Sequence, residues 1–220
     1  MTAALPPSLH ETWVPVGSRT EDVSISLLSI TAETTVYEHA ETPKIGHCDI
    51  QPRSLLGIDV DLSPSLSALG KSVEDVMSLA ADPAKERFVS LLDEEGITVQ
   101  DERSVTEFDR GDGIAGRWYV FETTHLVGDA RIDTETHLAA WPAGDRFVMA
   151  GGTIPLEAPP EDALQVGVEA EAEVGAEIHP TTDRETIAAF VRARVRETVD
   201  SVEGLEEVDA AAELDESAID

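Results

Sequence analysis

Four β-rich stretches separated by three short turns dominate residues 97–156. Each stretch is rich in β-branched and aromatic residues, which favour extended backbone. The expected strands are residues 97–108, 114–127, 130–141 and 146–156. The breaks between them consist mainly of Asp, Gly and Pro, which preset turns or tolerate a positive φ. Since connections this short join antiparallel neighbours, the second half of the chain is predicted to form an antiparallel meander.

Further strands are expected before the meander. Residues 1–22 contain three prolines and little periodicity, which predicts an N-terminal arm whose Trp13 packs on the body. β-branched residues crowd into 23–37 and favour one long strand or a bent pair. Residues 41–48 are expected to be a loop, and the alternation over 50–62 predicts another strand.

Two helical segments are expected. Apolar positions at helical spacing over 73–92, with a restart at Pro83 and a Gly96 end signal, predict one broken helix or two short ones. A closing helix is expected from about Thr182. Its apolar stripe is made of Ile187, Phe190, Val191, Val195 and Val199. Strands and helices in this order predict an α+β domain, an antiparallel β-sheet meander with helices packed on one face.

The predicted organisation has four parts. An arm (1–22) precedes the α+β domain (23–156), and residues 157–202 add an acidic strand and the closing helix. Residues 203–220 hold eight acids and no cation, which predicts a disordered acidic tail. Three arginines of the closing helix are placed away from its apolar stripe, as a solvated face or a dock for that tail. They are Arg192, Arg194 and Arg196.

The charge of the 220-residue chain excludes several partners. It carries 45 Asp and Glu against 15 Lys and Arg, a formal net charge of -30. Nucleic-acid binding needs a basic stripe, and anionic lipid needs a polybasic face. No apolar run approaches the roughly 18 residues of a membrane span, and no leader pattern is visible. With a single cysteine, Cys48, there is no internal disulfide framework. We therefore expect a soluble cytoplasmic protein.

Lysine occurs only three times, although 41% of the residues are hydrophobic. Molar salt shortens the Debye length to about 3 Å and would screen the self-repulsion of so many acids. This composition resembles that of halophilic archaeal cytosolic proteins. An acidic mesophile protein with an acidic tail is the alternative.

The order of elements over 23–156 and the closing helix resembles the PsbP-like fold, in which helices flank an antiparallel sheet. The resemblance implies a non-enzymatic binding or assembly factor, although fold alone does not determine function. The motifs GxxxxGK[ST], GxGxxG, GxSxG, HExxH and CxxC do not occur in the sequence, which lowers the prospect of a nucleotide enzyme, a zincin or an α/β-hydrolase.

A candidate polar cluster lies on the central hairpin. If Gly128 and Asp129 form a two-residue loop, residues whose numbers sum to 257 are paired, and side chains at alternate positions share a face. The clustered residues are Glu122, Asp133, Glu135 and His137, with Trp118 and Thr124 nearby. Two carboxylates and an imidazole in reach of one another are suited to a divalent cation or to acid/base chemistry. In so acidic a chain, solvated carboxylates on a sheet face are the alternative, and a register slip of one residue would disperse the cluster.

Other residues invite a functional interpretation beside a structural one. The aromatic residues of the meander are interpreted as core or as the lining of a ligand pocket. They include Trp118, Tyr119, Phe121 and Trp141. Cys48 beside His47 is interpreted as a buried thiol or a nucleophile, and His125 as a hydrogen-bonded histidine of the core or its rim.

Function is therefore expected to be non-enzymatic: a binding or adaptor module for a protein partner or a small molecule, with no cofactor. The alternative is a small metal-assisted enzyme built on Glu122, Asp133, Glu135 and His137, and a third option is a purely structural subunit. No metal site is established by the sequence.

Overall fold

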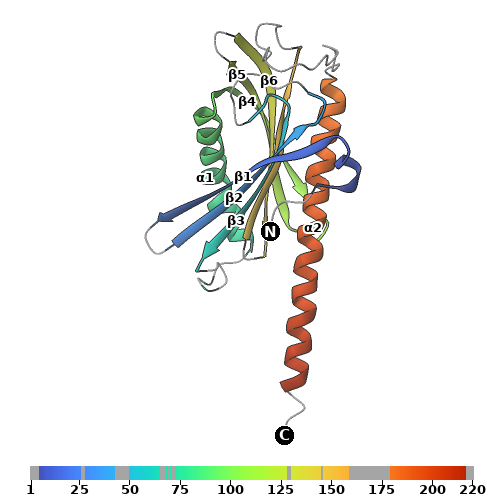
Figure 1. Ribbon diagram of the computed structural model, residues 1–220. Coiled ribbons are helices and arrows are strands. Elements are labelled where there is room, and N and C mark those ends of the chain that lie inside the picture. The colour runs from blue at the N-terminus through green and yellow to red at the C-terminus, as the bar shows by residue number, and fades with distance from the viewer. Residues whose placement is uncertain are drawn as a thin grey trace.

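The computed structural model describes residues 5–25, 28–42, 50–64, 68, 70, 73–127, 130–144, 146–158 and 179–216. Their elements, in chain order, are η1 (Pro7–Leu9), β1 (Trp13–Ile25), β2 (Leu28–His39), β3 (Ser54–Ser63), α1 (Val73–Glu94), β4 (Ile97–Asp109), β5 (Ala115–Val127), β6 (Ala130–Ala143), β7 (Arg146–Pro155) and α2 (Pro180–Glu216). The strands form one seven-stranded antiparallel sheet in the order β1-β2-β3-β7-β6-β5-β4 (Figure 1).

The predicted meander is confirmed. Strands β4 to β7 begin and end within a residue or two of the expected limits. Val127 pairs with Ala130 and Glu122 with Glu135, which is the register expected from a two-residue loop. The predicted cluster is therefore on one face of the β5–β6 pair.

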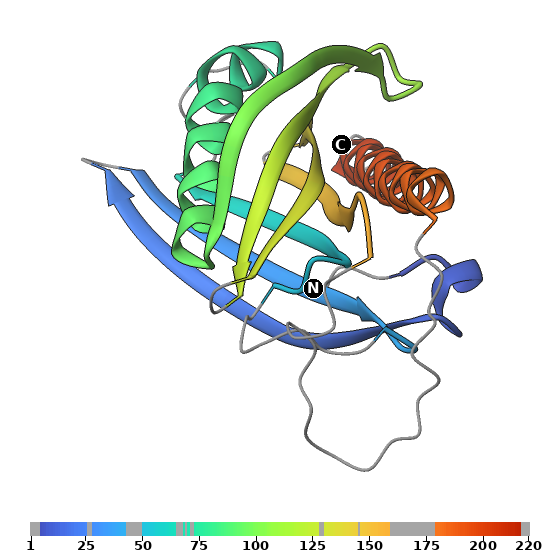
Figure 2. The ribbon, with the colours of Figure 1, turned by 90° about the horizontal axis from the view of Figure 1, so that it is seen from above.

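The two helices cover opposite faces of the sheet, as Figure 2 shows. Leu55 and Val148 belong to the core that includes Ile187 of α2, whereas the next residues, Leu56 and Met149, belong to the core under α1. The α+β class is confirmed, but the expectation that the helices share one face was wrong. Residues 138–143 of β6 and 147–150 of β7 are apolar at consecutive positions, which is typical of strands buried on both faces.

Helix α1 is continuous through Pro83. Ion pairs tie it to both edges of the sheet: Arg87 contacts Glu21 of β1 at 2.8 Å, and Lys85 contacts Glu102 of β4 at 3.0 Å. The sheet therefore wraps around α1. Neither described helix holds an apolar stretch long enough to cross a bilayer.

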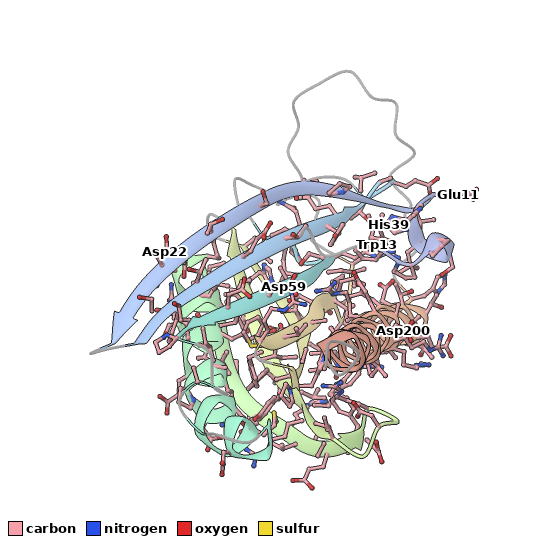
Figure 3. All side chains as sticks on the ribbon, turned by 90° about the horizontal axis from the view of Figure 1, so that it is seen from below. Glu11, Trp13, Asp22, His39, Asp59 and Asp200 are labelled. Atoms are coloured by element: carbon pink, nitrogen blue, oxygen red, sulfur yellow. The ribbon has the colours of Figure 1, made fainter. Side chains whose placement is uncertain are left out.

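The N-terminal segment differs from the predicted arm, because residues 13–25 form β1. Pro15 and Gly17 lie at a bulge of this edge strand, where a missing ladder N–H is tolerated. Trp13 is 4% exposed and lies edge-on to His39, with ring centroids 5.3 Å apart (Figure 3). The expected 41–48 loop, with Cys48 and His47, and the acidic strand expected before α2 lie mostly outside the described residues.

Helix α2 begins where expected and its backbone continues to Glu216, well into the segment predicted to be a tail (Figure 1). Ala, Glu and Leu dominate this stretch and have high helix propensity. One of the three arginines was misplaced. Arg192 and Arg196 are exposed, whereas Arg194 is 3% exposed and contacts Asp59 of β3 at 2.7 Å. Arg194 follows Phe190 by four residues and so belongs to the buried stripe.

Candidate functional site

Trp118, His137 and Glu135 form a hydrogen-bonded chain on the α2 side of the sheet. The indole Nε1 of Trp118 donates to His137 Nδ1 at 3.1 Å, and His137 Nε2 lies 2.8 Å from Glu135 Oε1. An indole N–H can only donate, so Nδ1 carries no proton. A neutral His137 therefore carries its proton on Nε2 and donates it to Glu135.

Two arginines from other elements complete this chain. Arg184, in the first turns of α2, donates from Nε to Glu135 Oε1 at 2.6 Å and from Nη2 to Oε2 at 3.1 Å. Arg103 of β4 lies 3.4 Å from Glu122 Oε1 and 3.9 Å from Glu135 Oε2. Neither arginine was predicted to belong to the site. Their contribution could be found only from the three-dimensional arrangement, because Arg184 is 49 residues from Glu135 along the chain.

The environment sets the charge of both titratable groups. Burial alone would raise the pKa of Glu135, but the hydrogen bonds from Arg184 and His137 outweigh it and hold this pKa below its ordinary value. Burial lowers the pKa of His137 below its ordinary value, although Glu135 opposes the shift. The site thus holds an ionised carboxylate paired with a guanidinium, beside a neutral imidazole.

The predicted four-residue cluster divides into three smaller contacts. Glu135 contacts His137, Glu122 contacts Arg103, and Asp133 accepts a 3.2 Å hydrogen bond from Thr124. Among the described residues, no group of three or more His, Cys, Asp or Glu is arranged to hold a metal ion. Both oxygens of Glu135 already face Arg184, so the arrangement gives the divalent-cation hypothesis no support.

The four candidate ligand-lining aromatics do not line one space. Tyr119 and Phe121 are 1% and 2% exposed and stack at 6.2 Å within the core under α1. Trp141 is fully buried on the other face, where its Nε1 donates to Thr198 Oγ1 of α2 at 3.0 Å. Only Trp118 is partly exposed.

His125 lies in the core, which was one of the two expected positions, but no described residue supplies the expected hydrogen bond at Nε2. It pairs with Ile132, it is 1% exposed, and its buried Nε2 has no hydrogen-bond partner in the described part of the chain. Burial lowers the pKa of His125 to about 4, so the ring is neutral at physiological pH.

The first turns of α2 are clamped by two neighbouring residues of opposite charge. Asp183 accepts from Arg53 Nη2 at 2.7 Å and from Arg53 Nε at 3.2 Å, just before β3. Arg184 reaches Glu135 of β6 in the opposite direction. Glu135, which the sequence predicted to lie beside His137, therefore also fixes the first turns of α2 to the sheet.

Beside this anchor, none of the described elements covers part of the sheet. A helix is about 10 Å wide and strands are about 4.8 Å apart, so one helix covers two or three strands. Helix α2 packs on β7 and β6. The side chains that follow on β5 and β4 are partly or fully exposed, and we call them the open face. They are Arg103, Ser104, Trp118, Val120 and Glu122, with Leu126 further along β5 beyond the buried Thr124.

Comparison with known proteins gives a family without an assigned function. The family described as Domain of unknown function (DUF6517) matches residues 11–194, and the chain belongs to it. No curated protein and no solved structure matches the chain. The matched range includes every residue of the site and of the open face.

Proposed function

We propose that the protein is a non-enzymatic binding module, an adaptor that holds a protein partner on its open face. The observation that supports this most directly is Trp118, an aromatic ring that is half-buried on a sheet face that no described element covers and is held there through Nε1. Trp and Arg are the residues that most often dominate the energy of protein interfaces. Here Arg103, with a side chain 50% exposed, belongs to the same face.

The state of the polar groups favours binding over catalysis. A general base needs a free lone pair, yet Nδ1 of His137 is occupied by Trp118. A carboxylate nucleophile or metal ligand needs an available lone pair, yet Glu135 Oε1 accepts from both Arg184 and His137, and Oε2 accepts from Arg184, which also compensates its charge. The alternative of a metal-assisted enzyme on this cluster therefore has less support than the adaptor.

The shape and chemistry of the open face favour a protein over a small molecule. Small-molecule sites are concave and bury most of their ligand. The open face is instead a sheet surface on which apolar groups alternate with charges. Leu126 is 52% exposed, and the side chain of Glu122 is 43% exposed. Such a mixture of exposed apolar and charged groups is typical of protein interfaces.

A pair of charge insertions tests the proposal. Leu126→Arg places a charge on the open face, and Val16→Arg places the same charge on β1, where Val16 is 41% exposed and far from that face in the sheet order. We expect a partner purified with the wild-type chain to bind Val16→Arg unchanged and Leu126→Arg at least about tenfold more weakly, as a buried unpaired charge requires. Equal binding by both variants contradicts the proposal.

We further propose that the adaptor works in the salt-rich cytoplasm of a halophile. The support is the charge of -30 and the presence of only three lysines. The PsbP-like order of elements is compatible with a binding role, and it too stays a prediction. A circular-dichroism titration from about 0.1 to 4 M KCl tests the salt requirement, because repulsion is screened only when the Debye length is a few ångströms. Full stability at the lowest salt would contradict it.

A further inference from the structure

His137 connects the open face to the α2 anchor, because its two ring nitrogens have different partners. Nδ1 accepts from Trp118 of β5, and Nε2 donates to Glu135, which is itself held by Arg184 of α2. Only the neutral ring can serve both partners. The imidazolium carries protons on both nitrogens and has no acceptor for an indole N–H.

We propose that His137 is a proton-operated latch on the open face: the neutral ring holds Trp118 in place, and protonation releases it. The inference rests on the proposed function in one respect only, since it regulates the face assigned to the partner. Release follows from hydrogen-bond chemistry, because the protonated Nδ1 and the Trp118 Nε1–H would both be donors facing each other across 3.1 Å.

The groups around His137 determine when the latch opens. Glu135, on the same strand, favours the charged ring, while burial and the nearby Arg184 of α2 oppose it. Arg103 of β4 and Glu122 of β5 lie around Glu135 with opposite charges. Strand β7 presents Gly152 opposite His137 and so adds no charge. The balance keeps the pKa of His137 below its ordinary value, so the latch should open at a lower pH than an exposed histidine would require.

Partner binding should then depend on pH. A partner that contacts Trp118 in its held position favours the neutral form of His137. By linkage, protonation of His137 must then weaken the binding of that partner. A single hydrogen bond contributes about 0.5–1.5 kcal/mol net, which corresponds to about two- to tenfold weaker binding once the latch is open. Above the titration of His137, affinity should be constant.

Nuclear magnetic resonance of the full chain tests the latch without any partner. With ¹⁵N-labelled histidine, we expect His137 at pH 8 to show a protonated Nε2 and an unprotonated Nδ1. On acidification, the indole N–H resonance of Trp118 should shift with the same midpoint as His137. His137→Gln keeps both a donor and an acceptor and should leave Trp118 insensitive to pH, provided that circular dichroism shows the native fold.

Each outcome has a separate meaning. An Nδ1-protonated His137 at pH 8, or a Trp118 signal that ignores the titration of His137, would overturn the latch whatever the protein binds. A coupled titration without any change in affinity for the purified partner would overturn its control of the open face. If Leu126→Arg does not weaken the binding of the purified partner, the proposed function is contradicted and the latch is not.

Discussion

Replacing Arg184 by methionine should destabilise the protein by about 2 kcal/mol. The Glu135 side chain is 7% exposed and accepts three hydrogen bonds, two of them from Arg184. The variant leaves the carboxylate with His137 and with the more distant Arg103, 3.9 Å from Glu135 Oε2. Hydrogen bonds to charged groups are each worth about 1.5–3 kcal/mol. Because the Arg184 side chain is 42% exposed, solvent screening reduces the total well below the sum of two such bonds.

Unfolding in guanidinium chloride at fixed KCl and pH 7.5 measures this loss, and thermal melts should show a decrease of about 4–8 °C, at about 2–4 °C per kcal/mol for a chain of this length. Arg192→Met is the matched control. Arg192 is exposed on the same helix, so its replacement should stay within about 0.5 kcal/mol of wild type.

The double variant Glu135→Gln with Arg184→Met separates the pair from general helix effects. A neutral amide needs no counterion, so the double variant should be less destabilised than the two single losses added together, with a coupling of about 1–2 kcal/mol. If Arg184→Met were as stable as Arg192→Met, the argument that α2 is anchored through Glu135 would be refuted.

Three further predictions concern the core. A Cβ at Gly151 would collide with the backbone carbonyl of His137, so Gly151→Ala should cost about 3 kcal/mol in thermal or chemical unfolding; at Gly17 nothing lies within 4 Å, and Gly17→Ala should be neutral within about 0.5 kcal/mol. The pKa of His125 is about 4 in the folded chain and 6.5 in the unfolded chain. The contribution of His125 to the free energy of unfolding is therefore complete above pH 6.5, and about 3 kcal/mol of it is lost as the pH falls towards 4. His125→Leu should flatten this part of the plot of stability against pH. Asp59→Asn should cost about 2 kcal/mol, because it leaves the buried Arg194 with Glu197 as its remaining carboxylate partner. Replacing both Asp59 and Arg194 by leucine should restore most of the loss in the same assay.

The register of the β5–β6 hairpin was predictable because local rules control it. A two-residue loop at 128–129 determines the pairing of every residue along both strands, and side-chain alternation then places Glu135 and His137 on one face. The proximity of these two residues followed directly. The contact of Glu135 with Arg184 could not be predicted in this way. Helical periodicity indicates which side of α2 Arg184 occupies, but it does not indicate that β6 lies opposite that side.

Two other features were missed for identifiable reasons. Pro15 and Gly17 are turn-forming residues and concealed β1, which tolerates both because they lie at an edge bulge. Arg194 was assigned to solvent by its charge, although its spacing from Phe190 places it on the buried side of α2, where Asp59 compensates the charge. The consecutive apolar residues of β6 and β7 indicate strands that are buried on both faces, so the sequence already favoured helices on both sides of the sheet.

The strand order has a consequence for how the chain folds. Within the group β1 to β3, and within the group β4 to β7, each strand pairs with its neighbours in sequence. The two groups are joined where β3 pairs with β7, and there Leu55 lies opposite Gly152, roughly a hundred residues later in the chain. Closing so long a loop costs more entropy than forming either hairpin stack. The two groups should therefore form early and quickly, and the docking of β3 on β7 should limit the rate of folding. A chain cut between β3 and α1 would keep every pair of strands that are adjacent in sequence. It would lose only the covalent connection between the two groups that pair through β3 and β7.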